Sequence, residues 1–208
     1  MTATLYCVLE GANGKVSTRQ DRMGAITQIR DREALADYVK AGRKVKYVFF
    51  WGHRRSKTGI SASCFSQWYA APFIADEQSY LTAEHFMMAE KARLFDDRGA
   101  LEKILAARSP GEAKSLGRNV RGFDEEIWIE RRFDIVVAAN KLKFSQNSDL
   151  LVFLLGTGQK ILVEASPVDK IWGIGHEAKH PNADNPRLWK GLNLLGFALM
   201  EVRTQLST

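Results

Sequence analysis

Cysteine is scarce in this sequence, with only Cys7 and Cys64 among 208 residues. Two cysteines are too few for a disulfide framework, so we expect a reducing compartment. The N-terminus has none of the basic region, apolar core and cleavage site of a signal peptide. The sequence also has no run of ~18 apolar residues, which a transmembrane helix requires. We therefore predict a cytoplasmic protein with no membrane partner.

The sequence also lacks the motifs of several large enzyme classes. It has no P-loop and no GxSxG elbow. The segments Gly156-Thr-Gly158 and Gly173-Ile-Gly175 have neither the third glycine nor the strand-then-helix setting of a dinucleotide fingerprint. His176-Glu-Ala-Lys-His180 matches HExxH, but Pro181 follows it directly, glycines precede it, and no obvious third ligand is present. We predict no metal and no cofactor.

The charge balance is moderately basic. Thirty lysines and arginines against 24 aspartates and glutamates give a net charge of +6. This balance favours anionic partners such as phosphates or nucleic acid, but it is equally ordinary for a mildly basic enzyme. The densest basic group is the glycine-bounded segment 52–59 (GHRRSKTG). Arg54 and its neighbours are either a clamp for a phosphate or part of a solvated loop.

Hydrophobic periodicity predicts more helices than strands. Residues 45–51 and 160–165 are rich in β-branched and aromatic side chains and predict strands, and residues 5–9 predict a third. Apolar stripes, N-caps and glycine stops predict helices at residues 32–41, 80–97, 101–108, 110–117, 125–146, 150–155 and 186–206. Gly191 and Gly196 each weaken the last helix by ~1 kcal/mol relative to alanine, so we expect close packing or ligand approach there.

In the helix predicted at residues 80–97, charged and apolar side chains share one face. Glu84, Met88, Lys91 and Phe95 lie at i, i+4, i+7 and i+11. Met and Phe indicate that this stripe faces the interior, where an ionised group needs a partner. Glu84 and Lys91 are about two turns apart, too far to pair with each other. Each therefore meets another residue or a ligand, unless both reach solvent at the edge of the core.

The apolar stripe of the helix predicted at residues 125–146 becomes polar in its C-terminal half. Asn140, Lys143 and Asn147 continue the stripe there. A buried Asn beside a Lys must be hydrogen-bonded to something. The alternative is that this end of the helix frays into solvent.

Four segments of this chain carry multi-residue motifs: Tyr80–Phe95 (YLTAEHFMMAEKARLF), Ala139–Asn147 (ANKLKFSQN), Leu162–Gly175 (LVEASPVDKIWGIG) and Asn193–Arg203 (NLLGFALMEVR). Together they resemble the YbiA-like or NADAR domain family. The resemblance runs from about residue 47 to residue 203, so residues 1–44 are interpreted as an N-terminal extension or added lobe and residues 45–208 as the family domain. One departure is the segment 65–68 (FSQW), where the family more often has LSNF; it bears on the base that is recognised.

The resemblance implies a single α+β domain, mainly helical with a small β-sheet, that hydrolyses N-glycosidic bonds. Its substrates would be ribosylated bases that carry phosphate. One branch of the family is tied to phosphorylated aminopyrimidine ribosides of riboflavin biosynthesis. Others are tied to the removal of ADP-ribose from guanine in nucleic acid, which would make nucleic acid the carrier of the modified base.

Breaking an N-glycosidic bond requires a carboxylate near the anomeric carbon or its attacking water, and an acid for the departing base. Glu84 is our first choice for the carboxylate, and Asp169 is the second acid candidate. Lys91 would either orient the acid or a phosphate, or attack the ring-opened ribose aldehyde as a Schiff-base amine if burial lowers its pKa. Lys143 competes for the same role.

The remaining candidate residues would bind the substrate. Asn140 and Asn147 would bond ribose hydroxyls or the base edge, while Trp172 or Trp128 would stack on the base; Trp128 is equally explained as a core residue. Glycines let the backbone approach a ligand closely. The predicted substrate-binding residues are Phe50, Gly52, Arg54, Ser66, Trp68, Trp128, Asn140, Lys143, Asn147, Trp172, Gly173 and Gly175.

Two other functions are compatible with the same residues. The domain could bind ADP-ribose or a nucleotide without turnover, in which case Glu84→Gln would leave affinity intact. It could also be a basic nucleic-acid-binding module, whose affinity would fall steeply with salt and ignore free ADP-ribose. We favour the enzyme, because an acid and an amine on a core-facing stripe are unusual in a passive surface.

Overall fold

The fold is built on a pair of parallel strands, and most of the helices lie between these two strands in the sequence. The computed structural model describes residues 26 and 28–207, so the strand predicted at residues 5–9 lies outside the described residues. Strand β1 (Tyr47–Phe50) pairs in parallel with β4 (Ile161–Glu164), with Phe50 opposite Glu164 at the carboxyl ends. Strands β2 (Phe73–Ala75) and β3 (Gln78–Tyr80) form a small antiparallel pair. The predicted mainly helical α+β domain is confirmed.

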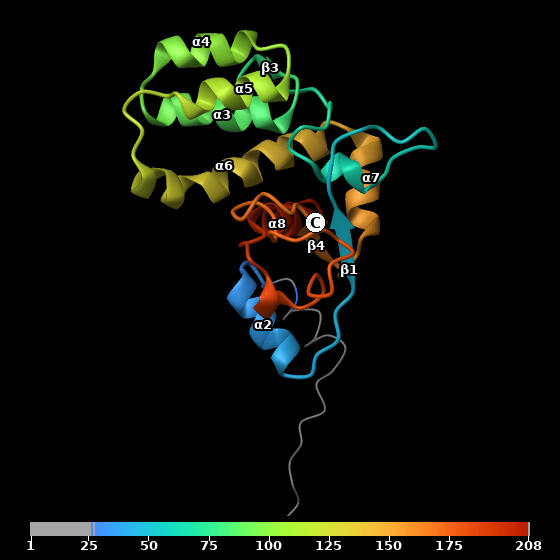
Figure 1. The fold of residues 1–208 in the computed structure, drawn as a ribbon. Helices are drawn as coiled ribbons and strands as arrows, with labels where there is room; N and C mark the ends of the chain where they lie inside the picture. Colours follow the sequence, from blue (N-terminus) through green and yellow to red (C-terminus); the bar gives the residue numbers. More distant parts are fainter. Residues whose placement is uncertain (1–25, 27, 208) are drawn as a thin grey trace, which may run out of the picture.

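Helices α3, α4 and α5, with bounds given below, form a cluster at one end, and the long helix α6 runs alongside it towards α7 (Figure 1). Helix α3 packs against α4, α5 and α6, while α8 packs against both α6 and β4. The helices of the described residues are α2 (Arg32–Lys40), α3 (Ala83–Leu94), α4 (Arg98–Ala106), α5 (Pro110–Arg118), α6 (Glu125–Ser145), α7 (Ser148–Gly156) and α8 (Leu194–Leu206), with 3-10 turns η1 (Ala62–Phe65) and η2 (Pro186–Leu188).

Local capping accounts for several helix starts. Asp31 accepts a hydrogen bond from the amide of Ala34 and begins α2. Asp124 accepts from two amides of the first turn of α6. Ser109 caps α5 by accepting from Glu112, whose own carboxylate accepts from the amide of Arg108. These side chains accept hydrogen bonds from amides that have no partner inside their helix. Because each cap residue lies only two or three residues from those amides, the sequence predicts these helix starts well.

The last helix begins later than the sequence predicted. Residues 186–188 form only the short turn η2, and α8 begins at Leu194 because Asn193 adopts a left-handed conformation with φ of 56°. Leu188 is consequently 48% exposed instead of joining the core stripe. Gly196 does lie in α8, and a Cβ there would stand 2.1 Å from the carbonyl oxygen of Leu162. The predicted close packing at this glycine is therefore the contact of α8 with β4.

The described part of the N-terminal extension packs against the C-terminal half of the chain. Helix α2 contacts η2, and the guanidinium of Arg32 donates to the carbonyl of Trp189 at 3.2 Å. The division into residues 1–44 and 45–208 stays a prediction. No helix in the described part of the chain is long and apolar enough to cross a bilayer.

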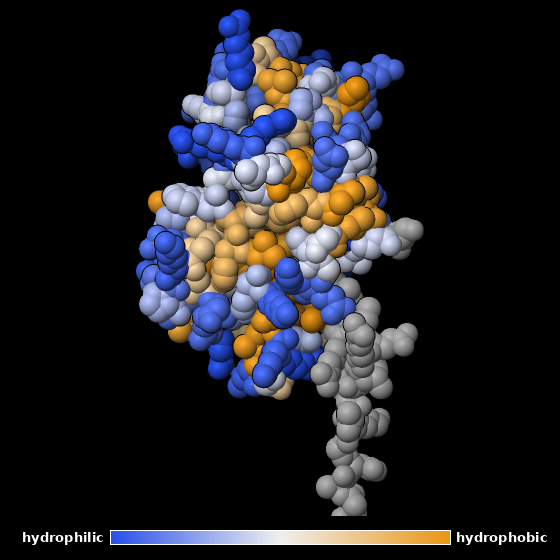
Figure 2. Space-filling model, turned by 90° about the vertical axis from the view of Figure 1, so that its right-hand side faces the viewer, coloured by the Kyte–Doolittle hydropathy of each residue, from blue (hydrophilic) through white to orange (hydrophobic). Residues whose placement is uncertain are grey.

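The face of the molecule that carries α7 has a band of apolar side chains at mid-height (Figure 2). On α7 itself Val152 is 72% exposed. None of the α7 residues lines the cavity of the candidate active site.

Candidate active site

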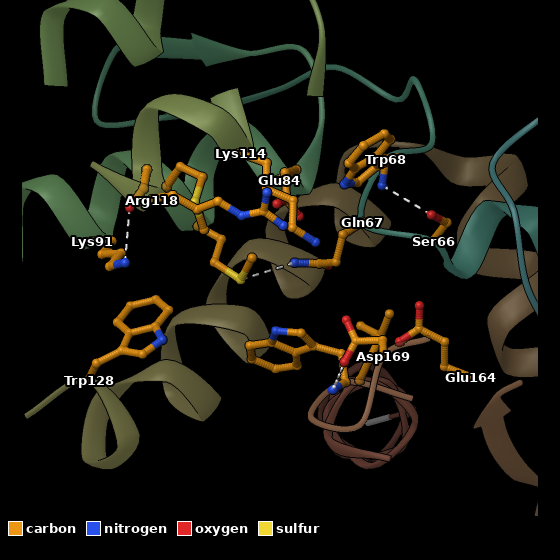
Figure 3. A pocket seen from close by; sticks show the side chains of 15 residues that line it. Ser66, Gln67, Trp68, Glu84, Lys91, Lys114, Arg118, Trp128, Glu164 and Asp169 are labelled. Atoms are coloured by element: carbon orange, nitrogen blue, oxygen red, sulfur yellow. Dashed lines mark hydrogen bonds between the residues drawn. The ribbon is translucent and has the colours of Figure 1, made fainter. Parts of the chain in front are cut away.

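A cavity of about 150 Å³ lies between the helix cluster and the carboxyl end of β4 (Figure 3). Its walls come from α3, α5, the first turns of α6, the segment after η1, and the loop after β4. Charged side chains and indole rings dominate the lining. The lining residues are Ser66, Gln67, Trp68, Glu84, Met87, Met88, Lys91, Lys114, Gly117, Arg118, Trp128, Glu164, Asp169, Trp172 and Leu195.

Glu84 is placed by the first turn of α3, which begins after the cap residue Thr82. Its amide donates to the backbone carbonyl of Gln67 at 3.0 Å, which joins α3 to the segment after η1. The side chain is 2% exposed, and its Oε1 has no hydrogen-bond partner. Burial raises the pKa of Glu84 to about 7, against the opposing effect of the nearby Lys114 ammonium. A carboxyl group with this pKa can hold or release a proton at neutral pH.

A second carboxyl group, that of the half-buried residue Glu164, lines the same cavity and was not among the predicted residues. Its Oε2 also has no hydrogen-bond partner. Burial is the main cause that raises its pKa to about 8, and the neighbouring charge of Asp169 raises it further. Glu164 is the last residue of β4 and directly follows three fully buried apolar side chains. The sequence did contain a signal for this residue, because Glu164 is an acid at the end of a strand whose other residues are all apolar.

Asp169 lies beside Glu164 at the cavity, as Figure 3 shows. Its Oδ1 accepts hydrogen bonds from the amides of Ile171 and Trp172, at 2.9 and 2.8 Å. Its own amide donates to the hydroxyl of Ser166 at 3.1 Å. The aspartate therefore organises the turn that carries Trp172 into the cavity wall, as well as lining the cavity itself.

Three cations line the same cavity, and two of them, Lys114 and Arg118, lower the pKa of Glu84. The ammonium of Lys91 donates to the carbonyl of Gly117 at 2.9 Å and lies 4.0 Å from the centre of the Phe123 ring and 5.5 Å from that of Trp128. Burial lowers the pKa of Lys91. Lys114 and Arg118, on consecutive turns of α5, were not predicted. Since α5 is amphipathic and short, its sequence gave no reason to separate these two from ordinary surface cations.

The segment after η1 is held from behind by α6. The fully buried ammonium of Lys143 donates to the carbonyls of Cys64 and Ser66, at 2.6 and 2.9 Å. The side-chain amide of Asn140 donates to Oε1 of Gln67 at 2.7 Å. Burial lowers the pKa of Lys143 to about 7. Asn140 and Lys143 are therefore buried and their end of α6 is not frayed, while Asn147 lies just beyond α6 and is half-buried.

The structure brings together seven of the predicted site residues, which line the cavity: Glu84, Lys91, Asp169, Ser66, Trp68, Trp128 and Trp172. The other predicted residues do not line it; these are Phe50, Gly52, Arg54, Asn140, Lys143, Asn147, Gly173 and Gly175. The functional roles assigned to both groups stay predictions. The cavity residues that sequence reasoning missed include Gln67, Lys114, Arg118 and Glu164.

The residues outside the cavity have structural contacts of their own. Asn147 donates to the carbonyls of Lys143 and Pro72. Phe50 is 4% exposed and packs edge-on against another core ring. Arg54 lies in the exposed loop 52–59. A Cβ at Gly173 would stand 2.9 Å from the carbonyl of Glu164, so this glycine lets the turn pass behind the acid.

The HExxH match is not on a helix. Residues 176–180 form bends and turns, in which the rings of His176 and His180 stack with centroids 3.9 Å apart. His176 is tied to the carbonyl of Leu188 at 3.0 Å. Among the residues that the structure describes, no group of three or more His, Cys, Asp or Glu could hold a metal ion.

Comparison with known proteins identifies related sequences over most of this chain. The sequence model described as NADAR domain matches residues 49–207. The chain is 46% identical over 165 residues to the N-glycosidase R617 of Acanthamoeba polyphaga mimivirus, covering 77% of this chain and 96% of that protein. It is 36% identical over 138 residues to the chloroplastic riboflavin biosynthesis protein PYRR of Zea mays, covering 63% of this chain and 20% of that protein.

The fold also resembles a solved structure. The NMR structure of the E. coli protein YbiA superimposes with a TM-score of 0.61 at 27% sequence identity, covering 79% of this chain and 87% of that one.

Proposed function

The chain belongs to the NADAR domain family, and we propose that it is an N-glycosidase that hydrolyses the bond between a ribose and a base. The observation that carries this proposal is that the carboxyl group of Glu84 is buried at the cavity. It is 2% exposed and lines the cavity with an oxygen that has no partner. Trp68 hydrogen-bonds the Glu84 carboxyl group, but the buried Oε1 has no partner. A buried carboxyl oxygen without a partner costs stability, which is typical of a group that acts in catalysis.

The substrate class we propose is a ribosylated base that carries phosphate. The cavity has room for a sugar-sized group, and Lys114 and Arg118 supply positive charge along its α5 wall. One such substrate is guanine of a nucleic acid that bears ADP-ribose. Another is a phosphorylated aminopyrimidine riboside, which the name of the riboflavin biosynthesis relative supports. Both present the same ribose–nitrogen bond to Glu84.

Hydrolysis of this bond leaves the sugar with positive charge while a water molecule attacks its anomeric carbon. The ionised form of Glu84 would stabilise that charge and accept a proton from the water. Trp68, Trp128 and Trp172 offer ring faces to the base at the cavity wall. Asp169 is the second acid of the predicted pair, and it lies on the same side as Glu164.

Lys91 has two roles open to it. Its ammonium is held by the Gly117 carbonyl and two aromatic rings, which suits a cation that orients a phosphate or the acid. Its lowered pKa also enlarges the fraction of neutral amine, which could attack the aldehyde of a ring-opened ribose as a Schiff-base nucleophile. Reduction with cyanoborohydride during turnover separates the two roles, because only a Schiff base leaves a sugar permanently attached to Lys91.

The proposed function is tested by direct turnover. Purified protein is incubated with a guanine-ADP-ribosylated DNA oligonucleotide and, separately, with phosphorylated aminopyrimidine ribosides, and released sugar is followed by mass spectrometry. Glu84→Gln is the test variant, and Glu177→Gln, at an exposed position, is the matched control. We expect release by the wild type and the control from at least one substrate, and a loss of at least about 100-fold in Glu84→Gln.

Two outcomes contradict the proposal. Binding of ADP-ribose without release from any substrate would leave a recognition module. Equal release by the wild type and Glu84→Gln would remove the carboxylate from the reaction.

A further inference from the structure

Glu164 places a carboxyl oxygen without a hydrogen-bond partner in the cavity, although no role has been predicted for this residue. The Oε2 atom of Glu164 is buried and has no hydrogen-bond partner. The same is true of Oε1 of Glu84, which lines the same cavity. Two such oxygens in one cavity of about 150 Å³ are a large cost if neither acts on a ligand. The two acids also approach from different elements, Glu84 from the first turn of α3 and Glu164 from the end of β4.

The backbone of Glu164 is fixed from both sides. Its amide donates to Oδ1 of Asn193 at 2.9 Å, and its carbonyl accepts from the amide of Ile174 at 2.9 Å. The residue also pairs with Phe50 across the two parallel strands. A side chain on so constrained a backbone can be held in one orientation, which is what proton transfer in a defined direction requires.

The charged groups around Glu164 come from three other parts of the chain. Asp169 and Glu84 raise its pKa, and Lys114 on α5 lowers it, but burial is the largest effect. The outcome, about 8, leaves Glu164 mainly protonated at neutral pH. Glu84 is the more readily ionised of the two, because Lys114, Arg118 and a hydrogen bond with Trp68 lower its pKa. For Glu164, the charge of Asp169 raises the pKa more than Lys114 lowers it. Environments that separate two carboxyl groups in this way are typical of an acid and a base in one site.

We propose that Glu164 is the general acid that protonates the leaving base. This assignment rests on the proposed N-glycosidase function, and it adds a catalytic residue to that site. In the proposed step, the bond between the ribose carbon and the base nitrogen breaks, and its electron pair stays on the nitrogen, which takes the proton of Glu164. Water forms the new bond to the carbon and gives a proton to Glu84. Glu164 ends ionised and Glu84 ends protonated, and exchange with solvent restores both.

Asp169 fits the acid role less well. Its Oδ1 already accepts two amide hydrogen bonds, from Ile171 and Trp172, which is the arrangement of an acceptor rather than a proton donor. Its position beside Glu164 instead gives it an electrostatic function, since a second negative charge there keeps a proton on Glu164.

The test compares the pH dependence of kcat in wild type, Glu164→Gln, Glu164→Asp and the exposed control Glu177→Gln, on the substrate that the wild type cleaves. We expect the wild-type rate to fall at high pH, because the acid must be protonated, and to fall at low pH, because Glu84 must be ionised. Glu164→Gln should lower kcat by about 100-fold or more with KM changed only a few-fold, and should lose the alkaline fall. Glu164→Asp should keep that fall at a reduced kcat.

Far-UV circular dichroism and thermal unfolding establish that the variants are folded, and Glu164→Asp supplies a second reading if Glu164→Gln does not fold. A kcat within a few-fold of wild type in Glu164→Gln would overturn the proposal. So would an alkaline fall that persists in Glu164→Gln, or one that is absent from Glu164→Asp. Absence of turnover in the wild type is a different result, because it removes the proposed function itself.

Discussion

The amide of Glu84 donates to the backbone carbonyl of Gln67, and the side-chain carbonyl of the same Gln67 accepts from Asn140. The candidate catalytic carboxylate is thereby connected to α6 through one intervening residue. Lys143, one turn further along α6, holds the carbonyls on either side of Phe65. The polar stripe of α6 therefore fixes the segment against which Glu84 is set.

Replacement of Lys143 by Met should impair catalysis through this segment, without contact with the substrate. Two buried carbonyls would lose their donor, and a displacement of the segment by about 1 Å would lower kcat by about 10- to 100-fold. The measurement is steady-state kinetics, with the exposed neighbour Lys141→Met as control. Kinetics of Lys143→Met that match those of Lys141→Met would show that the segment keeps its place unaided.

Lys114 and Arg118 should act on the phosphate of the substrate. We expect replacement of both by Met to raise KM by about 10- to 100-fold, because charge-assisted hydrogen bonds to a phosphate contribute about 1.5–3 kcal/mol. The effect should vanish on the matching riboside that lacks phosphate. Lys103→Met, at an exposed position on α4, is the control. An equal loss on both ribosides would instead assign the pair to the sugar or the base.

Glu164 should make the stability of the protein depend on pH. Its pKa is raised from 4.5 to about 8 on folding, so the folded state binds more protons than the unfolded state between these values. Stability must therefore fall as pH rises through this window and level off above it. Glu164→Gln should be more stable than wild type at pH 9, by on the order of a few kcal/mol, and similar at pH 4. Chemical denaturation at both pH values checks this, and a wild type that is the more stable at pH 9 would contradict it.

Gly196 should not tolerate a side chain. Alanine favours a helix over glycine by ~1 kcal/mol, but the added Cβ would stand 2.1 Å from the carbonyl oxygen of Leu162. We expect Gly196→Ala to lower the free energy of unfolding by about 1–3 kcal/mol through the shift of α8 from β4. Gly156→Ala, where nothing lies within 4 Å, is the matched helical control and should be neutral or slightly stabilising. Thermal unfolding distinguishes the two, and equal midpoints would contradict the contact.

The sequence by itself determined the features that depend on near neighbours. The caps at Asp31, Ser109 and Asp124 are formed with amides two or three residues away, so their residue types are sufficient to locate them. The stripe of Glu84 and Lys91 on one helix was likewise legible from spacing, and both side chains are buried at the cavity. The family motifs indicated the fold and the reaction class.

Tertiary structure decided which polar groups share the cavity. Glu164 shares the cavity with Glu84 only because α3 and α8 both pack against α6 and α8 also packs against β4, which are contacts between segments far apart in the chain. From the sequence, the polar residues Asn140 and Lys143 of α6 are equally compatible with binding a ligand and with binding another part of the protein. Only the tertiary structure shows that Lys143 donates to the backbone carbonyl of Ser66. The start of α8 depended on a left-handed Asn193, whose side chain is bound to β4. Periodicity fixes which face of a helix is buried, but the partner of that face is set by packing of the whole chain.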